Sequence, residues 1–267
     1  QRQMCIRDSL NSLRTKRPES MAAYDLVLQG LEYAKRGNVM KENTEKAVEL
    51  FEKAIDVEPT YARAHAWRAC SLSNLADWED KPSPKLAEQA FNSINLALDL
   101  DPSEPEVHRI MGSIKLWRNR DYDSAEYHFE KAKELCPSDV FIISRYVNLL
   151  IYLGNFEKAL SELNRALRLD PFSHDLLFGP EFVCYFWLSD YSAASKSFFK
   201  IKMPRTHLFY YALVLFKEDK LESAKTKLTE AEVVTGMSID SFISSEPYKD
   251  KNLTKVLEQE LKTIKQL

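Results

Sequence analysis

Residues 140–171 constrain the fold more than any other stretch, because they hold one complete helix–turn–helix unit that the flanking sequence repeats. Apolar side chains recur at helical spacing from Ile143 onward, and Gly154–Asn155 supplies a turn. A second apolar stripe then begins, with the small residues Ala159 and Ala166 where two helices can approach closely. We therefore expect an antiparallel helix pair that ends at the following Asp-Pro.

The same pattern recurs along most of the chain. We place six repeats within residues 21–236, at 21–59, 60–102, 103–137, 138–171, 172–204 and 205–236. The first two carry extra residues, near 38–43 and 73–84, and the fifth has Gly179–Pro180 inside its first helix, where a proline should kink or delay that helix. Residues 237–267 form a C-terminal segment with an amphipathic helix over 252–266. We expect an all-α, right-handed α-solenoid of about six helix pairs with a C-terminal capping helix.

The repeating unit resembles the tetratricopeptide repeat. Gly154-Asn155-Phe156, Ala159, Ala166 and Pro171 match that family's pattern, whereas Val147 stands where the family has Gly or Ala. The resemblance implies that the first helix of each pair lines a concave groove, and that this groove binds a protein or peptide segment.

The resemblance also implies which side chains face the groove. Carried over position by position, they include Arg63, Arg109, Trp117, Asn148, Phe178, Phe182, Phe209 and Phe216, and we add Arg145, which lies beside Asn148 in the sequence. We expect the arginines at 63 and 109 to pair with carboxylates of a partner and the aromatic rings to anchor it. The alternative is that many of these rings pack between neighbouring repeats. A clamp for chaperone tails needs Lys and Asn in successive repeats, and only Asn148 beside Arg145 comes close, so we do not expect one.

Composition argues against several classes of function. The net charge is −3 and no basic stripe is present, so we expect no nucleic-acid binding. The longest uncharged apolar run, near residues 182–188, is too short to cross a bilayer, and no signal-peptide layout is visible. Cys5, Cys70, Cys136 and Cys184 form no CxxC pair, which favours buried packing roles in a reducing, cytoplasmic compartment.

Catalytic patterns are absent from the sequence. The histidines at 65, 108, 128, 174 and 207 are isolated, without HExxH or Cys/His spacing, and we interpret them as packing residues. No GxGxxG, P-loop or GxSxG motif occurs. We therefore expect a non-enzymatic interaction scaffold without a cofactor or metal ion.

The two ends carry further information. Residues 4–9 look like the translation of a transposon-end sequencing adapter, so we expect 1–9 to be foreign or disordered and 10–20 to be a linker. The residues 17–20, 23–26 and 247–250 resemble the C-terminal repeat region of bacterial adenylate cyclase-like and winged-helix regulator proteins. This resemblance implies the regulatory region of a larger bacterial signalling protein. The alternative is a module for self-association, or for docking onto an effector domain that this chain lacks.

Overall fold

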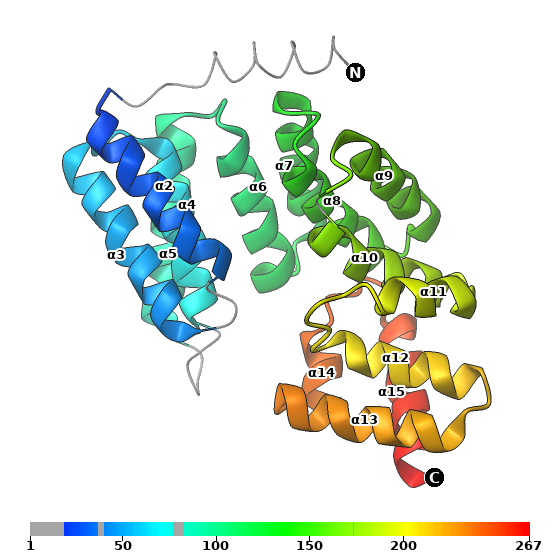
Figure 1. Cartoon of the computed structure of the whole chain (residues 1–267). Coiled ribbons are helices and arrows are strands. Elements are labelled where there is room, and N and C mark those ends of the chain that lie inside the picture. Colours follow the sequence, from blue (N-terminus) through cyan, green and yellow to red (C-terminus); the bar gives the residue numbers. More distant parts are fainter. Residues whose placement is uncertain (1–18, 37–39, 77–82, 173) are drawn as a thin grey trace. The chain divides into compact units, whose positions relative to one another are not determined.

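The computed structural model describes residues 19–36, 40–76, 83–172 and 174–267. Throughout these residues the regular structure is helical, without a strand (Figure 1). The helices, in chain order, are α2 (Met21–Arg36), α3 (Lys41–Val57), α4 (Ala62–Leu75), α5 (Pro84–Leu100), α6 (Pro105–Ile114), η3 (Lys115–Asn119), α7 (Tyr122–Leu135), α8 (Val140–Tyr152), α9 (Phe156–Leu169), α10 (His174–Trp187), α11 (Tyr191–Phe198), α12 (His207–Lys217), α13 (Leu221–Thr235), α14 (Ile239–Ser245) and α15 (Lys251–Gln266). This succession of helix pairs confirms the all-α solenoid.

The chain forms two compact units, Gln1–Ile142 and Ile143–Leu267. In the first unit, α2 packs on α3, α4 on α5, and α6 on α7. In the second unit, α10 packs on α11 and α12 on α13, and α15 packs on α12, α13 and α14. We refer to the first member of each pair as a first helix; the first helices are α2, α4, α6, α8, α10 and α12. None of the helices in the described part of the chain combines the length and apolarity needed to cross a membrane.

Close helix packing depends on small residues opposite aromatic rings. A Cβ atom on Gly30 of α2 would lie 2.5 Å from the ring of Phe51 on α3. A Cβ atom on Gly112 of α6 would lie 3.1 Å from the ring of Phe129 on α7. Both rings are fully buried, so glycine is what lets each helix pair close around its phenylalanine.

Two buried histidines tie successive pairs together. His65 and His108 each place Nε2 near the carbonyl of a proline six residues earlier, at 2.8 Å from Pro59 and 2.9 Å from Pro102. His108 Nδ1 also lies 3.0 Å from His128 Nδ1. Because Nε2–H of His108 donates to the carbonyl, its Nδ1 must accept, and His128 Nδ1–H donates. Burial lowers the pKa of His128 to about 4, so this pair is neutral.

Three local features differ from the sequence expectation. The end of α6 widens into the π-helix η3, after which Arg120 adopts a left-handed conformation (φ 55°). We expected Pro180 to kink or delay its helix; α10 starts at His174 with Pro180 inside it, so the start is not delayed. Helix α14 forms before the expected capping helix, in a segment for which we predicted no particular structure. The extra residues expected near 38–43 and 73–84 lie partly in α3 and α4. Residues 37–39 and 77–82, and the expected tail 1–9, fall outside the described residues.

Candidate functional site

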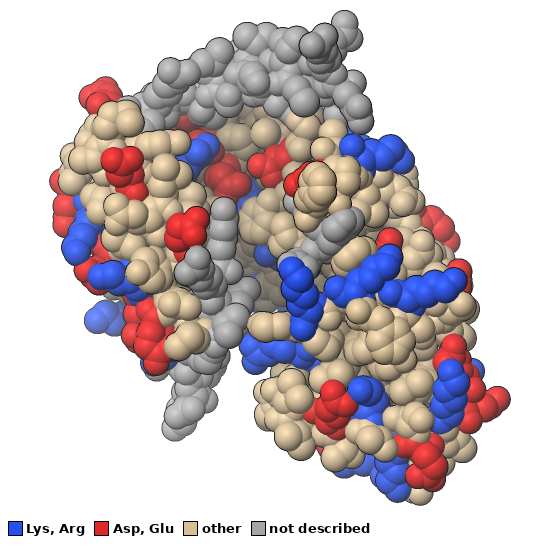
Figure 2. Space-filling view, in the orientation of Figure 1, with Lys and Arg blue, Asp and Glu red and all other residues tan. Residues whose placement is uncertain are grey.

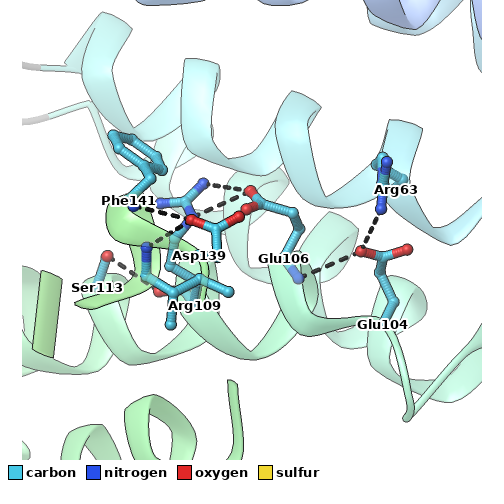
Figure 3. Close-up of polar contacts among 8 residues, drawn as sticks. Arg63, Glu104, Glu106, Arg109, Ser113, Asp139 and Phe141 are labelled. Atoms are coloured by element: carbon cyan, nitrogen blue, oxygen red, sulfur yellow. Dashed lines mark hydrogen bonds and ion pairs between the residues drawn. The ribbon is translucent and has the colours of Figure 1, made fainter. Parts of the chain in front are cut away.

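The most distinctive polar cluster of the first unit surrounds a buried arginine on α6 (Figure 3). Arg109 is only 2% exposed, and its guanidinium lies 4.8 Å from the ring centre of Trp67 and 4.6 Å from that of Phe141. Its Nε and Nη2 donate to Glu106 Oε2 at 3.0 and 2.8 Å. Arg109 is therefore sandwiched by aromatic faces and neutralised from its own helix, one turn back.

A second ion pair connects α4 to the start of α6. Arg63 Nη2 donates to Glu104 Oε1 at 2.9 Å, and the same carboxylate accepts the N–H of Glu106 as the cap of α6. Burial raises the pKa of Glu104, and Arg63 opposes that rise. The Nε of Arg63 is buried and finds no acceptor among the described residues. This pair thus has unused hydrogen-bonding capacity.

Asp139 adds a third carboxylate, at the start of α8. Its Oδ1 accepts the N–H groups of Phe141 and Ile142 at 2.8 and 3.0 Å, which satisfies two donors of the first turn of α8. Burial raises the pKa of Asp139, and the negative charge of Glu106 raises it further.

These carboxylates border a small cavity of about 80 Å³, lined by Arg63, Glu104, Pro105, Glu106, Leu135, Cys136, Asp139 and Ile142. Pockets for small molecules typically measure about 300–1,000 Å³. The cavity is therefore too small for a cofactor, but it matches the tip of one side chain. We call the set of Arg63, Glu104, Glu106, Arg109 and Asp139 the carboxylate cluster.

Arg63 on α4 and Arg109 on α6 both belong to the carboxylate cluster, and each guanidinium is already paired with a glutamate of this chain. Arg109 is paired with Glu106 and Arg63 with Glu104. The expectation that they await carboxylates of a partner needs correction, because the chain supplies these carboxylates itself. Trp117, expected in the same groove, lies half-buried in η3.

In the second unit, two expected groove residues lie in the core. Phe182 and Phe209 are both fully buried. Phe182 packs on Phe198 of α11 and on two tyrosines of α12, and Phe209 stacks on Phe242 of α14. Their placement agrees with the packing alternative that the sequence left open. These two rings are unavailable to a partner in this conformation.

The remaining expected groove residues of the second unit are half-buried. They are Arg145, Asn148, Phe178 and Phe216. The ring of Phe178 is covered on one side by Lys200, whose Nζ lies 4.7 Å from the ring centre. No contact described for these four side chains brings them into a common site.

Sequence reasoning missed the three carboxylates of the cluster. Each stands at or next to the start of a first helix, in Glu104-Pro105-Glu106 and in Asp139. An acidic residue beside a helix-starting proline is a capping signal. That signal could have placed Glu104 at the N-terminus of α6.

A larger hollow of about 510 Å³ lies between α3, α4 and α5, and it is lined by Glu52, Ile55, Asp56, His65, Arg68, Gln89, Asn92, Ser93 and Leu96. Arg68 spans it: Nε and Nη2 donate to Glu52 Oε1 at 3.0 and 2.9 Å, and Nη1 donates to Ser93 Oγ at 2.6 Å. Arg68 thereby joins α3 to α5. Among the described residues, no group of three or more His, Cys, Asp or Glu side chains could hold a metal ion.

Comparison with known proteins supports the repeat fold. Residues 144–173 match the tetratricopeptide repeat family. No curated protein matches the chain significantly. Among solved structures, the chain is similar to PilW, a type IV pilus biogenesis factor, at 17% identity with a TM-score of 0.60, over 82% of this chain and 96% of that one.

Two further structures are similar. One is a tetratricopeptide repeat protein from Parabacteroides merdae, at 18% identity with a TM-score of 0.54, over 91% of this chain and 86% of that one. The other is human IFIT1, solved as a dimer with m7Gppp-AAAA, at 18% identity with a TM-score of 0.60, over 83% of this chain and 55% of that one. Identities this low show the fold alone. The chain is thus an all-α solenoid of helix pairs, and its residues 144–173 match the tetratricopeptide repeat family.

Proposed function

We propose that this chain is a protein-interaction scaffold that binds a segment of a partner protein on the first-helix face of its first unit. The carboxylate cluster is the specificity site, and the partner brings a lysine or arginine to it. The observation that carries this proposal is the cavity beside Glu104, Glu106 and Asp139, where two carboxylates have a pKa raised by burial.

The charges of the cluster favour a cationic partner group. Three carboxylates face two guanidinium groups, and Arg109 is fully engaged within the chain. A carboxylate with a burial-raised pKa is poorly solvated, so a positive charge nearby stabilises it. The cavity volume of about 80 Å³ suits an ammonium or guanidinium tip.

The proposal is tested by selecting peptides from a displayed random library on the intact chain. We expect enrichment of Lys and Arg, and a loss of affinity for these peptides of roughly tenfold in Asp139→Asn, the effect of one charge pair of about 1.4 kcal/mol. Asparagine keeps the helix-capping oxygen and removes only the charge. Glu88→Gln, an exposed change on α5, is the matched control. Enrichment of acidic peptides, or equal binding by the two variants, would contradict the proposal.

Nucleic acid is not the partner we propose. The net charge is −3, and over α12, α13 and α15 Lys and Arg lie beside Asp and Glu (Figure 2), as in the pairs Lys227–Glu230 and Lys265–Glu232. Such a surface neutralises its own cations, whereas nucleic-acid binding needs a stripe of free positive charge.

The wider context is a further proposal. From the resemblance noted in the sequence, we infer a regulatory region of a bacterial signalling protein with a cyclase or winged-helix domain. Sequencing the genomic DNA upstream of the codon for Leu10 tests this. Cys70, Cys136 and Cys184 form no disulfide, which suits the reducing cytoplasm. Self-association is the second candidate, and a light-scattering mass that rises with concentration would favour it.

A further inference from the structure

In the second unit, a segment from beyond the repeats lies against the first helices. Phe242 of α14 stacks on Phe209 of α12, with ring centres 4.3 Å apart and planes 9° apart. The ring of Phe242 also meets Tyr210 edge-on at 5.6 Å. Phe242 and Phe209 are both fully buried, so neither ring is open to solvent at this contact.

The residues after α14 continue across the neighbouring first helices. The ring of Tyr248 meets Tyr152 of α8 and Trp187 of α10 edge-on, at 5.1 and 5.6 Å. Trp187 Nε1 donates to Tyr248 Oη at 2.7 Å, and the hydroxyls of Tyr248 and Tyr210 are 2.9 Å apart. Since Tyr210 Oη donates to Glu246 Oε2 at 2.6 Å, Tyr248 must donate to Tyr210. Tyr248 is thus held on three consecutive first helices.

The backbone of this segment also behaves like that of a bound peptide. Residues 246–248 are neither helix nor strand, and Glu246 has extended dihedral angles (φ −74°, ψ 113°). Lys249 N–H donates to the carbonyl of Tyr152 at 2.9 Å. An extended backbone, a proline, anchored aromatic rings and a main-chain hydrogen bond are features of peptide recognition. A helix that only capped the array would need none of them.

The ends of the segment are placed so that it can leave without breaking the helices around it. Gly236 ends α13 in a left-handed conformation (φ 68°), and the side chain of Asp250 caps the start of α15. Helix α15 packs on α14, and it also packs on α12 and α13, which hold it in place independently of α14. The stretch between residues 236 and 250 is therefore a strap fastened at two helix boundaries.

We propose that residues 239–249 are an internal ligand of the second unit. They close its first-helix face, and a partner segment with the same chemistry, a phenylalanine separated by three residues from Glu-Pro-Tyr, binds there only by displacing them. This inference goes beyond the proposed function, which concerns the first unit, and its test uses different residues and a different peptide. Failure of one therefore leaves the other standing.

The test is a titration of a fluorescein-labelled synthetic peptide with the sequence of residues 237–250 against the full chain. The tethered segment competes at an effective concentration of the order of millimolar, so the wild type should bind the free peptide weakly. Phe242→Ala weakens the strap and should raise the affinity for the peptide by roughly tenfold or more. A peptide with alanine in place of its phenylalanine and tyrosine should bind neither protein. Phe199→Ala, at a 74% exposed phenylalanine of the same unit, should bind like the wild type.

The inference is overturned if Phe242→Ala keeps its helical circular dichroism yet binds the peptide no better than the wild type. Hydrogen exchange on the wild type covers the case in which that variant fails to fold. A displaceable strap predicts that the amide of Lys249 exchanges through a local opening, faster than the amides in the middle of α12. If the Lys249 amide exchanges only with global unfolding, the segment is a fixed part of the core and the inference is wrong.

Discussion

Replacing Arg109 by methionine tests the description of the carboxylate cluster most severely. Methionine keeps much of the apolar stem between Trp67 and Phe141 but removes the guanidinium that neutralises Glu106. Removing one partner of a buried ion pair typically costs about 3–5 kcal/mol. Since Glu106 is 14% exposed and can turn to water, we expect the low end, a loss of about 3 kcal/mol in the free energy of unfolding.

The assay is urea unfolding followed by circular dichroism, arranged as a double-mutant cycle with Glu106→Gln. Each single variant leaves one charge without its partner, and the double variant leaves neither. We therefore expect the double variant to be more stable than the sum of the single losses predicts, with a coupling energy of about 1–3 kcal/mol. A loss below about 0.5 kcal/mol for the Arg109 variant, or additive losses, would refute this account of the pair.

Three further predictions concern the helix pairs. Gly30→Ala should destabilise the fold by about 1–3 kcal/mol, although alanine favours helices, because its Cβ would meet the Phe51 ring at 2.5 Å; a gain in thermal stability would contradict this. Ala159→Leu should cost about 1–3 kcal/mol, since Ala159 is fully buried between helices, and an unchanged melting temperature would show that its register is wrong. The pKa of His128 is 6.5 in the unfolded chain and about 4 in the folded protein, so on acidification the unfolded state takes up the proton first. The free energy of unfolding should therefore decrease as the pH falls from 6.5 to 4, by up to about 1.4 kcal/mol per pH unit. In His128→Asn the urea midpoint should vary less over that range, and an equal slope would exclude this histidine as the cause.

The helix pairs could be predicted from the sequence because their determinants are local. Turn residues such as Gly154–Asn155, small residues such as Ala159 and the closing prolines recur within each unit, and each acts within one helix pair. The π-helix after α6 has no such signal in the sequence. The only trace of its extra residue in the sequence is a longer interval between the start of α6 and the turn at Arg120.

The site was predictable only in part, for two physical reasons. When the repeat positions are numbered from the start of α10, Phe182 falls on a groove position. When they are numbered backwards from the turn at Asp190, Phe182 falls on the side of α10 that packs against α11, as observed. Phe209 occupies a first-helix position as expected, but α14 covers it, and the sequence of a repeat does not show what a later segment will bury. The repeat positions single out Arg63 and Arg109, but they do not reveal the glutamates at the start of α6 that pair with them.

The central claim is that partners bind the first-helix face of the first unit through the carboxylate cluster. Hydrogen exchange of the full chain, with and without a lysine-containing peptide from the displayed library, tests it most directly. We predict slower exchange in α4, in α6 and in the first turn of α8 around Asp139, and no change in α3 and α5. Slower exchange confined to α3 and α5, beside the larger hollow, would contradict the claim.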